Sequence, residues 1–259
     1  MLNLLKNTAI KILESHPYGY AIGLSLVTRL NFLLPHESDY WGFRKLAKNR
    51  PDGLFLDLGA NQGHSAKGFN KVVSGWKLFS VEANPAHIFS LTKLKNSLIN
   101  FDFKIAAIDS EGGKELSFFI PYYGKIALHS SAATTLNEAK KGVKASFHRQ
   151  EKHVHYVQGK VKSVTIDELN LAPNIIKLDI QGKELEAFDG GRETLDKYSP
   201  DLLVEVLFNH LAVISKLAKL GYSPYAYIQK LDSFVKFDKK ELEPGVRNLF
   251  FSRRNLETI

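Results

Sequence analysis

The stretch Phe-Leu-Asp-Leu-Gly-Ala-Asn-Gln-Gly, residues 55–63, decides the fold class of this chain. Its apolar start and glycine-containing end are typical of a buried strand that runs into a tight turn and then a helix. Gly59 allows the backbone to turn sharply, and Gly63 allows it to approach a ligand or a neighbouring element closely. The first amide groups of the helix after the turn would attract a carboxylate or another anion. The stretch therefore predicts an α/β domain that binds a ligand at its first strand, turn and helix.

The rest of the chain repeats this alternation of strands and helices, with an interruption in the middle. Before the interruption, strands are predicted at 53–58, 76–81 and 101–107, and helices at 62–73 and 85–98. After it, helices are predicted at 182–198 and 209–220, and strands at 175–180, 202–207, 222–228, 234–237 and 248–252. Alternating strands and helices form a parallel sheet that is covered on both faces. We therefore expect a mostly parallel sheet with one antiparallel strand near Phe250.

The first fifty residues and the middle of the chain set the expected domain organisation. Residues 1–50 are predicted to form an N-terminal helical cap on a domain of residues 51–259. Residues of about 110–160 break the alternation, with a strand at 116–120 followed by polar and charged segments. Because binding loops concentrate in such segments, we interpret this one as an insertion over the end of the sheet, where a substrate would be selected. The sequence leaves the oligomeric state open.

The apolar stretch of residues 21–34 decides the relation to membranes. It is shorter than a membrane span and carries Arg29, and no cleavage site of small residues follows it. We therefore expect a soluble, cytoplasmic protein. A peripheral membrane contact through residues 1–34 is the alternative, because their start carries a helical apolar stripe.

Composition excludes several kinds of chemistry. The chain has no cysteine, which rules out disulfides, thiolate metal ligands and cysteine nucleophiles. Its three clustered histidines, His148, His153 and His155, lack the spacing of a known metal site, so no metal is expected. The net charge of +8 favours acidic partners. Without an arginine-rich run or a nucleic-acid motif, however, we interpret it as a solvated basic surface and expect no specific nucleic acid.

A second pattern, Ser-Val-Glu-Ala-Asn-Pro at residues 80–85, follows the glycine turn at the next strand. Glu82 ends that strand, where an acidic residue can accept hydrogen bonds from both hydroxyl groups of a ribose. A dinucleotide fingerprint, G-x-G-x-x-G, would need glycine at Asn61. The two patterns together predict a nucleoside-containing ligand that is not a dinucleotide.

A third pattern, Ile-Ile-Lys-Leu-Asp-Ile-Gln-Gly-Lys-Glu at residues 175–184, places charges in an apolar strand. Lys177 and Asp179 alternate onto the same face and can neutralise each other. Asp179 also ends its strand, where open α/β sheets bind their ligands. Glu184 lies in the first turn of the next helix, where the helix dipole alone could explain it. Glu205 ends the following strand and could equally be a structural carboxylate.

These patterns, together with Val-Thr-Ile-Asp-Glu-Leu at 164–169 and Pro-Asp-Leu-Leu-Val-Glu at 200–205, resemble the FkbM-type methyltransferase family over residues 54–206. The resemblance implies a Rossmann-like class I methyltransferase with S-adenosylmethionine as methyl donor. It also implies a small-molecule or glycan acceptor with a hydroxyl group, on a sugar or a secondary metabolite. The family often has Glu where this chain has Gln181, which leaves one fewer candidate for the general base.

Site residues follow from the patterns and the resemblance together. The candidate cofactor-binding residues are Asp57, Gly59, Asn61, Gly63, Glu82 and Asn84, with Asp57 toward the ammonium group of the cofactor. Asp179 is the candidate base that removes the proton of the acceptor hydroxyl, assisted by Glu184 or Glu205. Two other functions stay open: a cofactor-binding or scaffold protein without catalysis, and a nicotinamide-dependent oxidoreductase.

Overall fold

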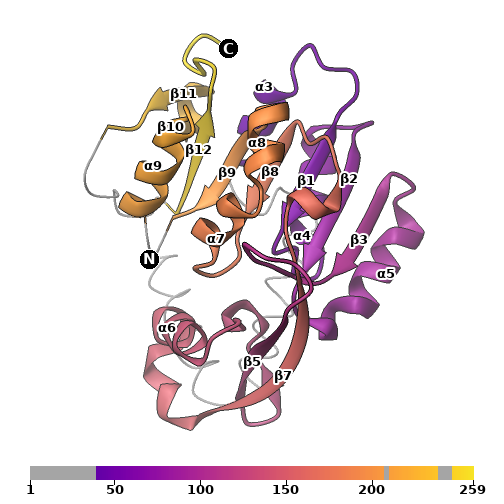
Figure 1. The fold of residues 1–259 in the computed structure, drawn as a ribbon, viewed down its shortest axis with the longest axis vertical. Helices are drawn as coiled ribbons and strands as arrows, with labels where there is room; N and C mark the ends of the chain where they lie inside the picture. Colours follow the sequence, from indigo (N-terminus) through magenta and orange to yellow (C-terminus); the bar gives the residue numbers. More distant parts are fainter. Residues whose placement is uncertain (1–38, 207–209, 239–246) are drawn as a thin grey trace, which may run out of the picture. The chain divides into compact units, whose positions relative to one another are not determined.

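The computed structural model describes residues 39–206, 210–238 and 247–259 (Figure 1). The described residues divide into two compact units, a smaller one of residues 117–160 and a larger one made of the rest. The predicted N-terminal extension lies mostly outside the described residues, and so does the alternative membrane contact through residues 1–34.

An eight-stranded sheet forms the centre of the larger unit, in the order β11-β10-β12-β9-β8-β1-β2-β3. Its strands are β1 (Leu54–Leu58), β2 (Lys77–Glu82), β3 (Phe101–Ile105), β8 (Ile175–Leu178), β9 (Asp201–Glu205), β10 (Ser223–Ile228), β11 (Ser233–Lys236) and β12 (Asn248–Ser252). The five strands from β9 to β3 are mutually parallel. β12, which contains Phe250, is antiparallel to both of its neighbours, as predicted, and β11 adds a second reversal through its hairpin with β10.

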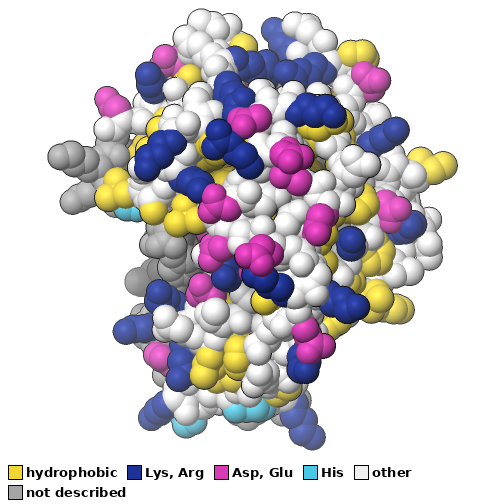
Figure 2. Space-filling model, in the orientation of Figure 1, with side chains coloured by type: hydrophobic (Ala, Val, Ile, Leu, Met, Phe, Trp, Pro, Cys, Tyr) yellow, Lys and Arg dark blue, Asp and Glu magenta, His cyan; other side chains and the backbone are white. Residues whose placement is uncertain are grey.

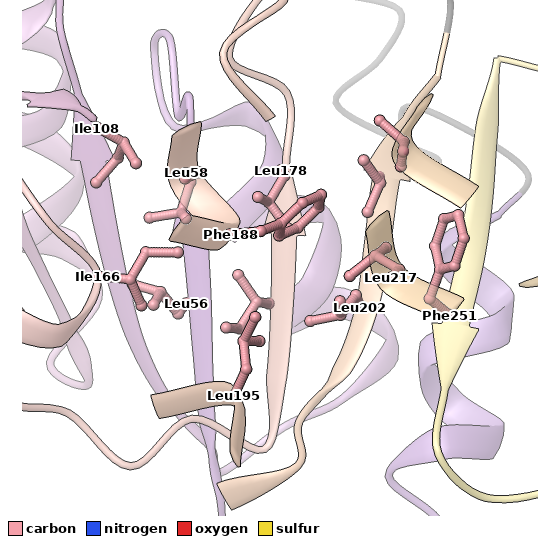
Figure 3. Packing of buried hydrophobic residues seen from close by; sticks show 14 of the residues in the cluster. Leu56, Leu58, Ile108, Ile166, Leu178, Phe188, Leu195, Leu202, Leu217 and Phe251 are labelled. Atoms are coloured by element: carbon pink, nitrogen blue, oxygen red, sulfur yellow. The ribbon is translucent and has the colours of Figure 1, made fainter. Parts of the chain in front are cut away.

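Helices cover both faces of this sheet. One face carries α3 (Tyr40–Leu46), α4 (His64–Val72) and α5 (Ile88–Ser97), the last entered through the 3-10 turn η1 (Pro85–His87). The other carries α7 (Glu184–Asp189), α8 (Arg192–Tyr198) and α9 (His210–Lys219). Alternate residues of each strand point to opposite faces of the sheet. Phe55 packs against α3, α4 and α5, and Leu56 packs against α7, α8 and α9. Figure 3 shows the second cluster, where Phe188, Leu195 and Leu217 lie over Leu56, Leu58 and Leu202.

The described end of the predicted N-terminal cap belongs to the core of the larger unit. Tyr40, Phe43 and Leu46 on α3 are at most 2% exposed. The ring of Phe43 lies 5.4 Å from that of Phe55 and 5.7 Å from that of Phe250, both in edge-on geometry. Such aromatic burial is a core contribution, so the compact domain begins before residue 51.

The helix predicted at 182–198 is wrong as a single element, because it breaks into α7 and α8 at Gly190 and Gly191. A Cβ atom at Gly190 would lie 2.5 Å from the carbonyl oxygen of Asp109, and one at Gly191 would lie 2.9 Å from Ile166. The glycines therefore permit a close approach of this segment to the loop after β4 (Ala107–Ile108) and to η4 (Asp167–Leu169).

The segment interpreted as an insertion has its own secondary structure. It contains β5 (Glu115–Tyr123), β6 (Ile126–Ala127), η2 (His129–Ser131), α6 (Leu136–Phe147), η3 (His148–His153) and β7 (Val154–Val164), and the second sheet has the order β4-β7-β5-β6. In the smaller unit, Tyr123, Leu128 and Val143 form a buried cluster. The sequence pattern does not predict α6, although Thr135 precedes its first turn as an N-cap: Thr135 Oγ1 accepts from the Glu138 amide at 3.2 Å.

Candidate functional site at the carboxyl edge of the sheet

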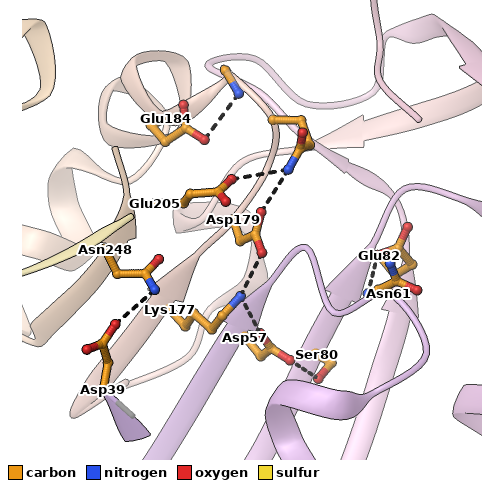
Figure 4. A network of polar contacts seen from close by, with 12 residues as sticks. Asp39, Asp57, Asn61, Ser80, Glu82, Lys177, Asp179, Glu184, Glu205 and Asn248 are labelled. Carbon is orange, nitrogen blue, oxygen red and sulfur yellow. Dashed lines mark hydrogen bonds and ion pairs between the residues drawn. The ribbon is translucent and has the colours of Figure 1, made fainter. Parts of the chain in front are cut away.

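The register of three parallel strands brings polar residues together where the strands end. Asp57 of β1 pairs with Ser80 of β2 on one side and with Lys177 of β8 on the other. Their side chains point to the face covered by α3, α4 and α5, because Phe55 and Ile175 on the same strands do so. Figure 4 shows these side chains converging, with Ser80 Oγ 3.3 Å and Lys177 Nζ 4.0 Å from the carboxylate of Asp57.

Lys177 joins two carboxylates of very different exposure. Its Nζ lies 3.3 Å from Asp179 Oδ2, and its side chain is 6% exposed. Asp57 is completely buried, whereas the side chain of Asp179 is 33% exposed. The predicted pairing of Lys177 with Asp179 is thus present, and Asp179 is the member of the trio that a ligand can reach.

Burial and charge set the pKa values of this trio. Burial raises the pKa of Asp57 to about 6, against the opposing charge of Lys177. Burial alone would also raise the pKa of Asp179, but Lys177 and hydrogen bonds from Glu205 and Gln181 hold it below its usual range. Asp179 is therefore a carboxylate at neutral pH.

The glycine turn packs against the loop that carries Asp179. Gly59 has a φ of +87°, and a Cβ atom there would lie 1.8 Å from the carbonyl oxygen of Asp179. Gly63 also has a positive φ, and a Cβ there would lie 2.6 Å from Leu94 on α5. At Gly59 the backbone of Asp179 leaves no room for a Cβ atom, whereas at Gly63 the positive φ of +80° is the main reason for glycine.

Glu82 clamps the glycine turn to the end of β2. Its Oε2 accepts from the Asn61 amide at 2.6 Å, and its Oε1 accepts from the Asn84 amide at 2.7 Å. Asn84 in turn caps the first turn of η1, because its Oδ1 accepts from the Ala86 amide at 3.0 Å. Burial raises the pKa of Glu82 to about 7 against the two amide hydrogen bonds. Each carboxylate oxygen still has a lone pair for a ligand hydroxyl, so the residues fit the ribose of a nucleoside.

Gln181 connects Asp179 to Glu205. Its Nε2 donates to Asp179 Oδ1 at 3.0 Å and to Glu205 Oε2 at 3.2 Å. Burial and the charge of Asp179 raise the pKa of Glu205 to about 9. Glu205 is thus protonated at neutral pH and donates to Asp179. The sequence predicts Gln181 only as the loss of a carboxylate, because no local pattern shows that its amide bridges Asp179 and Glu205.

The side chain of Glu184, the first residue of α7, contacts the loop between β8 and α7. Its side chain is buried, and its Oε1 accepts from the amide of Gly182 at 3.2 Å. Burial raises its pKa to about 6, partly offset by backbone amides of residues 180–184. In this geometry Glu184 stabilises the loop between β8 and α7.

Metal binding and membrane spanning are two further properties that the described residues address. No group of three or more His, Cys, Asp or Glu side chains in this part of the chain could hold a metal ion. No helix among the described residues is long and apolar enough to cross a membrane. On the face shown in Figure 2, Lys and Arg side chains are interspersed with Asp and Glu.

Comparison with known proteins identifies the family. The sequence model of one family, described as the methyltransferase FkbM domain, matches residues 57–224. The chain belongs to this family. The matched range contains every candidate cofactor-binding and catalytic residue, from Asp57 to Glu205, and most of the parallel part of the central sheet. A search of curated proteins gave no match.

Solved structures of methyltransferases show a remote likeness. An FkbM methyltransferase from Methylobacillus flagellatus KT is 14% identical, with a TM-score of 0.48 over 78% of this chain and 44% of that one. The C5,15-methyltransferase of precorrin-6y from Geobacter metallireducens GS-15 is 12% identical, with a TM-score of 0.39 over 80% of this chain and 82% of that one. Aeropyrum pernix fibrillarin, solved with natively bound S-adenosyl-L-methionine, is 10% identical, with a TM-score of 0.40 over 77% of this chain and 66% of that one. The chain thus spans less than half of the first of these proteins.

Proposed function

We propose that this chain is an S-adenosylmethionine-dependent methyltransferase that methylates a hydroxyl group of a sugar, a glycan or a secondary metabolite. Membership of the FkbM family supports the reaction class. The observation that carries the chemistry is the Asp179 carboxylate, one-third exposed at the carboxyl edge of the sheet and kept ionised by Lys177.

The residues around the glycine turn suit the cofactor. Glu82 would accept from both ribose hydroxyls with the lone pairs that Asn61 and Asn84 leave free. α4 begins at His64, and its N-cap residue, Gly63, provides no side-chain cap, so the first amides of the helix are suited to the carboxylate of the methionine part. Bound there, S-adenosylmethionine supplies an electrophilic methyl group.

Asp57 would act on the cofactor through its charge. Its side chain has no exposed surface, and Ser80, Ser65 and Lys177 interact with it. Its Oδ1 lacks a hydrogen-bond donor among the described residues, which leaves negative potential beneath the turn for the ammonium group. Asp57 also helps to hold Lys177 beside Asp179.

Asp179 would take the proton of the acceptor hydroxyl while the oxygen of that hydroxyl receives the methyl group. An alcohol is a weak nucleophile, and a base in hydrogen-bond reach typically contributes about 10²–10⁴-fold in rate. Lys177 keeps the base ionised before the proton arrives. Glu205, already protonated, serves as a donor that orients Asp179 and not as a second base.

Calorimetry and product release test the proposal. S-adenosylmethionine should bind the full chain, and NAD should not. Release of S-adenosylhomocysteine with labelled methyl in a hydroxyl-bearing acceptor would support methyl transfer. Binding of NAD in preference would favour the oxidoreductase, and tight S-adenosylmethionine binding without transfer to any hydroxyl-bearing acceptor would favour the scaffold.

A further inference from the structure

The side-chain oxygen of Gln181 makes no hydrogen bond within the described part of the chain. Its Nε2 donates to Asp179 and Glu205, and these are its only side-chain hydrogen bonds within the described part of the chain. The side-chain carbonyl oxygen, Oε1, therefore has no partner there. The residue is half-buried at the same edge as the one-third exposed Asp179.

The orientation of this amide is fixed by the two carboxyl groups. An amide nitrogen carries two hydrogens, and one is directed to each carboxyl oxygen. The flipped amide would place its carbonyl oxygen against the Asp179 carboxylate, where both atoms are acceptors. Oε1 must therefore point away from the pair.

The backbone holds Gln181 in this place at a conformational cost. Its φ is +56°, in the left-handed region, and Gly182 follows with a φ of +97°. A glutamine is unfavourable there, and such residues persist where the surroundings determine them, often at functional sites. The end of β1 and the glycine turn also hold this loop, since the Asp179 amide donates to the Leu58 carbonyl oxygen at 3.0 Å and the carbonyl of Asp179 contacts Gly59.

The charge around Gln181 selects the kind of group that can bind. Lys177 lies beside Asp57 of β1 and beside Asp179, which directly follows β8, and its charge also acts on Glu205 of β9. The exposed positions, the Asp179 carboxylate and Gln181 Oε1, are acceptors. A ligand must therefore supply donors, and an anionic substituent beside the reacting oxygen would be repelled.

We infer that Gln181 determines acceptor specificity: its Oε1 accepts from a second hydroxyl, next to the one that gives its proton to Asp179. The acceptor is thus an uncharged compound with two adjacent hydroxyl groups. Because Oε1 and Nε2 share one carbon and Nε2 contacts Asp179, the two acceptor positions are close enough for neighbouring hydroxyls. This inference rests on the proposed function and narrows its substrate class.

Matched acceptors test the inference. The full chain is assayed with S-adenosylmethionine and a panel of methyl hexopyranosides, each compared with its monodeoxy counterparts lacking one hydroxyl beside the methylated position and with its uronic acid. We expect wild type to lose at least tenfold in kcat/KM when the neighbouring hydroxyl is removed, and to reject the uronic acid. Gln181→Leu should be slower but lose this discrimination, whereas a purely structural role would lower both rates by the same factor.

Two further variants complete the design. Gln181→Glu keeps an oxygen acceptor, so it should retain the preference for the diol while its pH profile shifts. Gln158→Leu, which replaces an exposed glutamine of the smaller unit, should behave as wild type. Equal use of diol and monodeoxy acceptors by wild type would overturn the inference and leave the proposed function standing. Absence of transfer to every hydroxyl acceptor would overturn both.

Discussion

Replacing Asp179 by Asn separates a catalytic role from a structural one. The substitution keeps the shape of the side chain and its contact with Gln181, but it removes the carboxylate that would accept a proton. If Asp179 is the base, turnover should fall by about 10²-fold or more, while S-adenosylmethionine should bind nearly as in wild type.

The structure also limits the effect on stability. Lys177 loses a partner at 3.3 Å and keeps Asp57 at 4.0 Å. A hydrogen bond to a charged group contributes about 1.5–3 kcal/mol, and the one-third exposure of Asp179 places this one toward the lower end. A loss of about 1–2 kcal/mol would lower the melting temperature by roughly 2–8 °C in a chain of this size.

Glu205 gives this variant a pH signature. The charge of Asp179 helps to raise the pKa of Glu205 to about 9, so Asn at position 179 should let that pKa fall. Glu205 would then ionise at lower pH than in wild type, and any residual turnover should rise with pH. Single-turnover rates across the pH range and thermal melting measure both effects. An unchanged rate per folded molecule in a destabilised protein would refute the catalytic role and leave Asp179 as the counterion of Lys177.

Three further predictions concern Glu82, the glycine turn and the binding of nucleic acid. Glu82→Gln should weaken S-adenosylmethionine binding by roughly 10–150-fold at pH 8, the equivalent of about 1.5–3 kcal/mol. Because burial raises the pKa of Glu82 to about 7, the wild-type affinity for S-adenosylmethionine should fall as the pH drops through 7 and the carboxylate is protonated. The variant should show no such pH dependence. If calorimetry finds the same pH dependence in both proteins, Glu82 does not bind the cofactor. Gly59→Ala should lower the free energy of unfolding by about 3 kcal/mol or more in urea titrations, since the new Cβ meets the backbone of Asp179. The control Gly113→Ala, at a φ of +77° with open space around it, should lower it by only about 1–2 kcal/mol. Equal losses would mean that the turn at Gly59 relaxes to make room for the Cβ atom. RNA or DNA should bind only weakly and be released as salt approaches the physiological range, and tight retention followed by methylation of the bound nucleic acid would replace the small-molecule acceptor.

The order of the elements and the residues at the strand ends can be predicted from the amino-acid sequence. Phe55 to Gly63 predicts a strand, a turn and a helix because apolar periodicity and glycine positions are local properties of the chain. Parallel strands then require helical crossovers, so the α/β class follows without knowledge of any contact. The predicted pairing of Lys177 with Asp179 also needed only the two-residue period of a strand, and it is present.

The interactions between these residues depend on the packing of segments that are distant in the chain. Strand register placed Ser80 and Lys177 on either side of Asp57, although they are far apart in the chain. Periodicity predicts one helix at 182–198, but two glycines end it because neighbouring backbone comes too close for a Cβ atom. Glu205 and Gln181 differ most from their sequence interpretation. Glu205 is protonated because burial and the charge of Asp179 disfavour a second negative charge. Gln181 bridges the carboxyl groups of Asp179 and Glu205 because its left-handed backbone conformation directs its amide toward both.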